Sequence, residues 1–146
     1  MAEFDEMMEN RVWQRIHAEG SGQTLQSLAV AERSTAAVYL RLARMTQGPE
    51  KALLRQLFER ERRHSRCIHG VSMAAEGKPL SMRTVPPAAD HPTAALRKCY
   101  AASLKAAAEY DRRGADPDYG CVFRELAREE REHCRMILEV LGGQIG

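Results

Sequence analysis

The chain has 146 residues, of which 44% are hydrophobic and 5% aromatic, and its formal net charge is +2. This length suits a single domain, residues 1–146, that buries its own core without disulfide bonds. The charge is too small to indicate nucleic-acid binding, and no apolar run is long enough for a membrane span or signal peptide, so we expect a cytoplasmic protein.

Five helices are predicted, separated by glycine and proline residues that end or begin them. They cover about residues 3–17, 23–45, 50–75, 93–113 and 117–141. In the last case Asp116 is the expected cap and Pro117 the first helical residue. The connection from about Lys78 to Pro92 contains four prolines, which exclude a helix there.

The lengths of the links predict how these helices pack. Short links join the second helix to the third and the fourth to the fifth, and short links make antiparallel neighbours. Two such hairpins joined by a long crossover predict an all-α four-helix bundle over residues 23–141, with an accessory N-terminal helix in residues 1–20. That helix carries an apolar stripe, which packs either on the bundle or against a second chain; we expect a homodimer. The stripe consists of Phe4, Met8, Val12, Trp13 and Ile16.

Each predicted hairpin carries one Glu-x-x-His motif, Glu61 to His64 and Glu130 to His133. In both motifs the acid and the imidazole share a helix face with apolar residues, the face that packs into a core. Unpaired charges there would cost on the order of several kcal/mol. A metal ion shared by the two helices would satisfy all four groups; the alternative is a buried network of acids and protonated histidines. The other acids of the last helix lie out of this register and are assigned to solvent: Glu129 and Glu132.

The leading helices of the two hairpins also align, and they differ at one important position. In the first, Glu32 stands two turns before Tyr39 on an apolar stripe and should point into the bundle. The alignment places Ser103, or its neighbour Ala102, at the equivalent position of the second. The next acid, Glu109, should face away. The second hairpin therefore lacks the buried carboxylate that Glu32 provides in the first.

This pattern, over about residues 23–141, resembles the ferritin-like superfamily, in particular its rubrerythrin-like branch. In that family four helices surround two metal ions with one Glu, a second Glu and two Glu-x-x-His motifs. The resemblance implies a terminal carboxylate from the first bundle helix, two bridging carboxylates and two imidazole ligands. It also makes Tyr39 a candidate catalytic residue that hydrogen-bonds ligand carboxylates, with Tyr110 as its counterpart; core packing is the alternative for both. The implied metal ligands are Glu32, Glu61, His64, Glu130 and His133.

The resemblance implies a di-iron-type oxidoreductase that acts on a small oxidant, peroxide or dioxygen. Its cofactor would be one or two iron ions, although the same ligands suit zinc and manganese. Rubrerythrins also carry a Cys-x-x-Cys electron-transfer domain, whereas the four cysteines of this sequence contain no such pair, so the electron donor is unknown. Two other functions stay open: a metal-binding or storage protein without fast turnover, and a degenerate structural bundle that binds proteins through its N-terminal helix.

Overall fold

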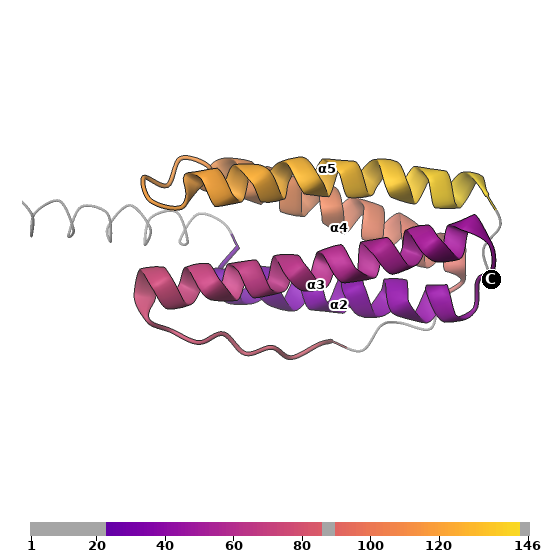
Figure 1. The fold of residues 1–146 in the computed structure, drawn as a ribbon, viewed down its shortest axis with the longest axis horizontal. Coiled ribbons are helices and arrows are strands. Elements are labelled where there is room, and N and C mark those ends of the chain that lie inside the picture. Colours follow the sequence, from indigo (N-terminus) through magenta and orange to yellow (C-terminus); the bar gives the residue numbers. More distant parts are fainter. Residues whose placement is uncertain (1–22, 86–89, 144–146) are drawn as a thin grey trace, which may run out of the picture.

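The computed structural model describes residues 23–85 and 90–143, and over these ranges the chain forms four long helices and no strand. Helices α2 and α3 form one antiparallel hairpin and α4 and α5 another, with a long crossover between them (Figure 1). The predicted all-α four-helix bundle is therefore confirmed. The predicted N-terminal helix lies outside the described residues, so dimerisation through it stays a prediction. The bounds are Leu25–Arg44 for α2, Pro49–Glu76 for α3, Pro92–Arg113 for α4 and Gly120–Gly142 for α5.

The helix ends follow capping signals of the sequence, with one exception. The Thr24 hydroxyl accepts a hydrogen bond from a backbone N–H in the first turn of α2 (3.0 Å), and Gly77 ends α3 in the left-handed conformation (φ 66°). The start of α5 was predicted three residues too early. Asp116 does cap backbone N–H groups two and three residues further on (2.8 Å each), but these belong to a turn. The helix begins at Gly120, where a Cβ atom would overlap the carbonyl oxygen of Gly114.

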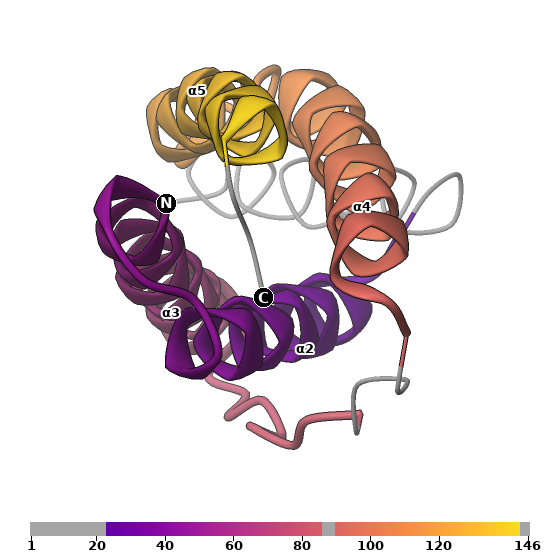
Figure 2. The ribbon, with the colours of Figure 1, turned by 90° about the vertical axis from the view of Figure 1, so that its right-hand side faces the viewer.

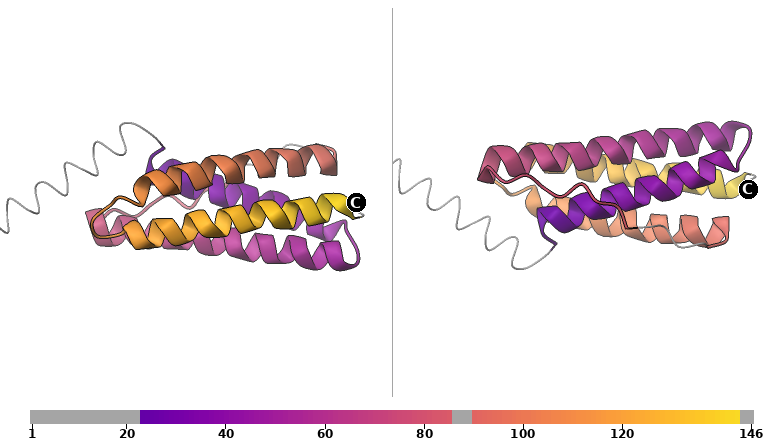
Figure 3. Two further views of the ribbon diagram at one scale, coloured as in Figure 1. Left: turned by 90° about the horizontal axis from the view of Figure 1, so that it is seen from above. Right: turned by 90° about the horizontal axis from the view of Figure 1, so that it is seen from below.

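The crossover runs along the outer side of the α2/α3 hairpin (Figures 2 and 3). The side-chain amide of Gln26 on α2 both donates to and accepts from the backbone of Ser81 (2.8 Å each). One residue earlier, the Leu80 N–H donates to Nδ1 of His69 on α3 (3.2 Å). These bonds fasten the crossover to both helices of the first hairpin.

The four helices surround a common interior (Figure 2). Within it two apolar clusters are separated by a polar layer of buried side chains. The polar layer consists of Glu32, Glu61, His64, Ser103, Glu130 and His133. One cluster, around Leu54, Leu96 and Ile137, fills the end where α2 turns into α3. The other, around Leu28, Ile68 and Phe123, fills the opposite end. Contacts are denser within each hairpin than between the hairpins. The polar layer takes its side chains from both hairpins and so lies where the two halves of the fold meet. None of the helices in the described ranges is long and apolar enough to cross a membrane.

Candidate metal centre

Two Glu-x-x-His motifs meet in the polar layer, one from α3 and one from α5. Glu61, His64, Glu130 and His133 are all buried, and each offers one ligand atom within 4.8 Å of the others. Residues three apart on a helix lie on the same face, so the spacing of each motif aims its two side chains at one point. The antiparallel packing of α3 against α5 then brings the two points together.

Each histidine contacts the glutamate of the opposite hairpin. Nδ1 of His64 lies 2.9 Å from Oε1 of Glu130, and Nδ1 of His133 lies 2.7 Å from Oε1 of Glu61. The two rings stack, with their centroids 5.0 Å apart. Both imidazoles therefore present the same nitrogen, Nδ1, to the centre and turn Nε2 away from it.

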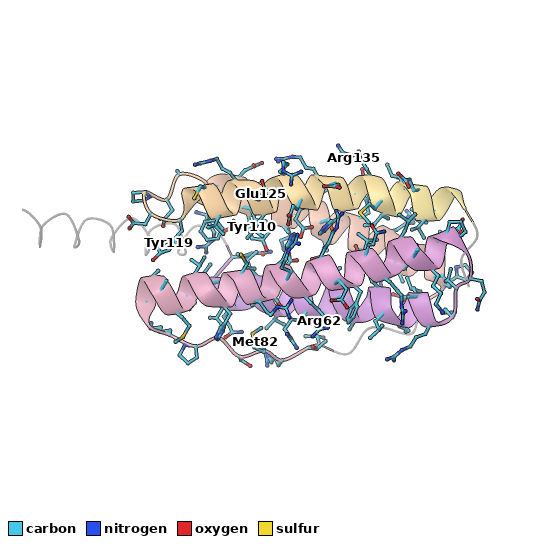
Figure 4. All side chains as sticks on the ribbon, viewed as in Figure 1. Arg62, Met82, Tyr110, Tyr119, Glu125 and Arg135 are labelled. Carbon is cyan, nitrogen blue, oxygen red and sulfur yellow. The ribbon has the colours of Figure 1, made fainter. Side chains whose placement is uncertain are left out.

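Glu32 reaches the same centre from α2, as predicted from its apolar stripe. Its Oε2 lies 3.4 Å from Nδ1 of His64 without a hydrogen bond, and its Oε1 accepts a hydrogen bond from the hydroxyl of Tyr110 (3.0 Å). Figure 4 shows Tyr110 between the helices of the bundle, whereas Arg135 projects outward from α5. Tyr110 thus orients this carboxylate so that its second oxygen faces His64 at the centre.

Tyr39 does not make the carboxylate contact that the resemblance implies. Its hydroxyl lies beside Ser103 on α4, although neither hydroxyl has a hydrogen-bond partner in the part of the chain that the structure describes. Ser103 is 2% exposed and occupies the position equivalent to Glu32, whereas its neighbour Ala102 is exposed. The reason that Tyr39 lacks a carboxylate partner is that its counterpart helix carries a serine where α2 carries Glu32.

A cavity of about 200 Å³ opens between α2 and α4 at Ser103. It extends to the carboxylates of the centre, since Glu32, Glu61 and Glu130 all line it. The next acid on α4, Glu109, faces away from the centre as predicted, although it is buried: it pairs with Arg113 (3.1 Å). No acid from α4 therefore reaches the centre.

Glu129 was assigned to solvent, and this was wrong. Its side chain is only 15% exposed, and its Oε2 lies 2.6 Å from Nε2 of His64. Its other oxygen accepts from Arg63 on α3 (2.8 Å). Glu129 lies at the edge of the buried face of α5, close enough to α3 to reach the outer nitrogen of His64. Glu132 is more exposed, at 33% of its side chain, and pairs with Arg60 (3.1 Å).

Burial, charges and hydrogen bonds shift the pKa values of several side chains at the centre. Burial raises the pKa of Glu61 well above its usual range, with the charges of Glu32 and Glu130 acting in the same direction. Burial raises the pKa of Glu130 too, but hydrogen bonds from the two histidines outweigh it and lower the pKa. Burial lowers the pKa of His64, but hydrogen bonds to Glu129, Glu130 and Glu32 raise it to about 11. His64 is therefore protonated at neutral pH in the absence of a metal ion, and donates from both nitrogens.

The donors fit a transition-metal ion better than a closed network of ion pairs. Carboxylate oxygens with imidazole nitrogens are a usual ligand set for iron, zinc and manganese. A closed network would pair every buried polar atom, yet Oε2 of Glu32, which faces the centre, has no hydrogen-bond partner among the described residues. Glu129 behind His64 is the arrangement in which a carboxylate fixes a ligating imidazole so that its other nitrogen is free for a metal.

Comparisons with known proteins support the architecture. No protein-family model and no curated protein matches the sequence. Among solved structures, the chain is similar to the bacterioferritin-related protein from Bacteroides fragilis, described as a dodecameric thioferritin. The two share 19% identity over 88% of this chain and 92% of that chain, with a TM-score of 0.62. The fold is ferritin-like. At this identity the likeness shows the fold alone, so membership of the rubrerythrin-like branch stays a prediction.

The two halves of this ferritin-like bundle are not equivalent. The α3 imidazole, His64, has Glu129 behind it, and the carboxylate on α2 is held by Tyr110. The α5 imidazole, His133, has no partner for Nε2 in the described ranges, because the residue equivalent to Glu129 on α3 is Arg60. In one half of the candidate centre the histidine and the carboxylate both have supporting partners, whereas the other half has no α4 carboxylate and no support for its histidine.

Proposed function

We propose that this protein binds divalent transition-metal ions, one tightly and a second weakly, and that iron is its working metal. The observation that carries the proposal is the convergence of the two Glu-x-x-His motifs on one buried point, with ligand atoms within 4.8 Å of one another. Zinc and manganese suit the same donors. Iron is proposed because of the resemblance to rubrerythrin-like proteins.

We further propose that the protein is a di-iron-type oxidoreductase that acts on peroxide or dioxygen. Bound iron would supply electrons, one for each ion that passes from Fe²⁺ to Fe³⁺, and two electrons with two protons convert peroxide to two waters. The cavity at Ser103 supports this proposal because it gives a small oxidant a path to the carboxylates. Apolar clusters on both sides of the polar layer limit the entry of bulk water. The electron donor is unidentified.

A second candidate is a protein that holds metal without fast turnover. It is favoured by the missing α4 carboxylate: Ser103 leaves three acidic side chains at the centre, where four would balance two divalent ions. A weakly held second ion would limit any reaction that needs both ions at once.

Metal stoichiometry tests the centre itself. Protein stripped with a chelator is reloaded with Fe²⁺ without oxygen and dialysed, and metal per chain is measured by atomic emission. Glu61→Ala and Glu130→Ala should abolish binding, because each removes a shared carboxylate, whereas His133→Ala should weaken only the incomplete half. Glu59→Ala on the exposed face of α3 is the matched control and should bind as the wild type does. No bound metal in the wild type, or full retention in both Glu61→Ala and Glu130→Ala, would overturn the proposal.

Peroxide consumption separates the two candidates. Fe²⁺-loaded protein is mixed with peroxide under anaerobic conditions, and residual peroxide and the ferric absorption band are followed together. An oxidoreductase consumes about one peroxide for every two ferrous ions oxidised, and repeats the cycle when a reductant such as dithionite is supplied. A storage protein retains iron but shows no faster loss of peroxide than free Fe²⁺ at the same concentration.

A further inference from the structure

The cavity between α2 and α4 lies where a carboxylate side chain from α4 is missing. It lies at the one position in the polar layer where a serine stands opposite a glutamate, Ser103 opposite Glu32. A water molecule needs roughly 10–15 Å³ of such volume, and the cavity offers about 200 Å³. The remaining lining residues are mostly small or neutral: Gln23, Leu28, Ala31, Thr35, Ala102, Lys105 and Ala106.

Two buried hydroxyls at this place lack partners. Ser103 lines the cavity, and Tyr39 lies beside Ser103; neither hydroxyl forms a hydrogen bond to any residue that the structure describes. A buried polar group without a partner destabilises the folded protein. A hydroxyl can donate as well as accept, and Ser103 Oγ lies in the cavity wall, so an acceptor in the cavity would give this hydroxyl a partner.

The charge of the centre requires an anion as well. The carboxylates that face the centre, those of Glu32, Glu61 and Glu130, bring three negative charges against the four positive charges of two divalent ions. The nearby carboxylate of Glu129 lies behind His64 and is paired with Arg63 (2.8 Å). Lys105, exposed on α4 where it lines the cavity, adds positive charge at the entrance. An anion that enters here would meet a metal ion on one side and hydroxyl donors on the other.

We propose that this cavity binds a small carboxylate anion, of the size of formate or acetate, which supplies the metal ligand that α4 lacks. The inference rests on the proposed metal centre. Exchange of serine for glutamate replaces the hydroxyl group by a CH₂–COO⁻ group, and acetate consists of the same atoms with one further hydrogen. Acetate in the wild-type cavity therefore restores what a glutamate at position 103 would have provided.

The test measures retention of the second ion. Metal-stripped wild-type protein is loaded with Mn²⁺, which is stable in air, in a buffer free of carboxylates, with rising sodium acetate at constant ionic strength. Acetate should tighten binding of the second ion by at least about tenfold, comparable to the effect of a supporting ligand contact, and should saturate. Acetamide has the same shape without the charge and should have no effect.

Variants at position 103 make the result specific. Ser103→Glu should hold two ions without acetate and should not respond to it, because its own side chain fills the cavity. Ala101→Glu is the matched control: position 101 is exposed on α4 and does not line the cavity, so this variant should still need acetate. Circular dichroism confirms that each variant folds.

Each outcome decides between the proposals. A first ion held normally, with no response of the second to acetate, would overturn the carboxylate site and leave the metal centre standing. An equal acetate response in Ser103→Glu and the wild type would place the effect elsewhere and also overturn it. No bound metal in any buffer would remove both proposals together.

Discussion

Glu129 is the residue whose removal tests the structure most directly, because it touches no part of the centre except the outer nitrogen of His64. Its Oε2 lies 2.6 Å from Nε2 of His64, and its other oxygen accepts from Arg63 at 2.8 Å. Glu129→Ala therefore leaves every predicted ligand in place. It removes only the group that holds the imidazole in its orientation and keeps the proton on Nε2.

The expected effect of Glu129→Ala on metal affinity and on stability follows from the burial of His64 and from the charge of this hydrogen bond. Loss of a carboxylate behind a ligating histidine typically weakens metal binding by about 10–100-fold, or about 1.4–2.7 kcal/mol. Without metal, Nε2 of the fully buried His64 loses its partner, and an unpaired buried donor costs about 1–3 kcal/mol of unfolding free energy. The lost contact to Arg63 adds little, since the arginine side chain is mostly exposed.

Two measurements check this prediction: metal affinity by isothermal titration, and urea unfolding of the metal-free protein. Glu132→Ala is the control, since Glu132 lies on the same helix and pairs with Arg60 but does not touch a histidine. It should change metal affinity less than about threefold and stability by less than about 1 kcal/mol. If Glu129→Ala bound metal as tightly as Glu132→Ala, the assignment of Glu129 as the support of His64 would be wrong.

Protonation, buried hydroxyls and helix contacts each give a further test. Hydrogen bonds raise the pKa of His64 to about 11, so a metal ion must displace a proton at neutral pH. Affinity should then rise with pH, by roughly tenfold per unit for each proton released; titration calorimetry in buffers of different ionisation enthalpy measures that release, and a pH-independent affinity would contradict it. Tyr110→Phe should lower the unfolding free energy by about 1–3 kcal/mol, because it leaves a buried carboxylate oxygen unpaired, whereas Tyr39→Phe should change it by less than about 0.5 kcal/mol. Urea unfolding measures both, and equal effects would refute the difference. Gly120→Ala should destabilise by about 1–3 kcal/mol through overlap with the preceding loop, whereas Gly70→Ala, with open space around its Cβ, should stabilise α3 by about 0.5–1 kcal/mol. Thermal unfolding gives the sign of each, and the same sign for both would contradict the packing seen at Gly120.

The fold was predictable because local signals and apolar spacing agree along the chain. Gly48 and Pro49 mark the turn between α2 and α3, and the period of buried residues on each helix is that of an amphipathic helix. The start of α5 was placed wrongly for a local reason. Asp116 carries a real cap signal, but the turn that it caps must first bring Gly120 against the carbonyl of Gly114. A sequence pattern cannot show this close approach of two backbone segments.

The residues at the centre were predictable for the same reason as the core. Acids and imidazoles in register with buried apolar residues must enter the interior, and Glu32, Glu61 and His64 do so. The role of Glu129 as the support of His64 could not be predicted from the register of α5 alone. Glu129 lies at the edge of the buried face of α5, and its position matters only once α3 is placed beside it. A signal was present: a buried imidazole has two nitrogens, and the outer one needs a partner on a neighbouring helix.

The exchange of roles between the tyrosines has a similar origin. Each tyrosine lies beside the leading helix of the other hairpin, so Tyr110 meets Glu32 while Tyr39 meets Ser103. The resemblance predicts a hydrogen bond from Tyr39 to a ligand carboxylate, and Glu32 is the acid that precedes Tyr39 on the same helix. The packing of α2 against α4 assigns that acid to Tyr110.

The position of the polar layer at the meeting of the hairpins has a consequence for assembly. Since α3 and α5 each provide one Glu-x-x-His motif, an ion bound between them joins the two hairpins as a non-covalent cross-link. The long crossover opposes docking of the two hairpins only weakly, because the entropic cost of closing a loop grows by only about 0.6 kcal/mol for each doubling of its length. A metal ion at a free concentration of 100 times its dissociation constant would stabilise the state in which the two hairpins are docked by about 2.7 kcal/mol. The supply of metal would then determine how firmly the two halves of this chain stay together.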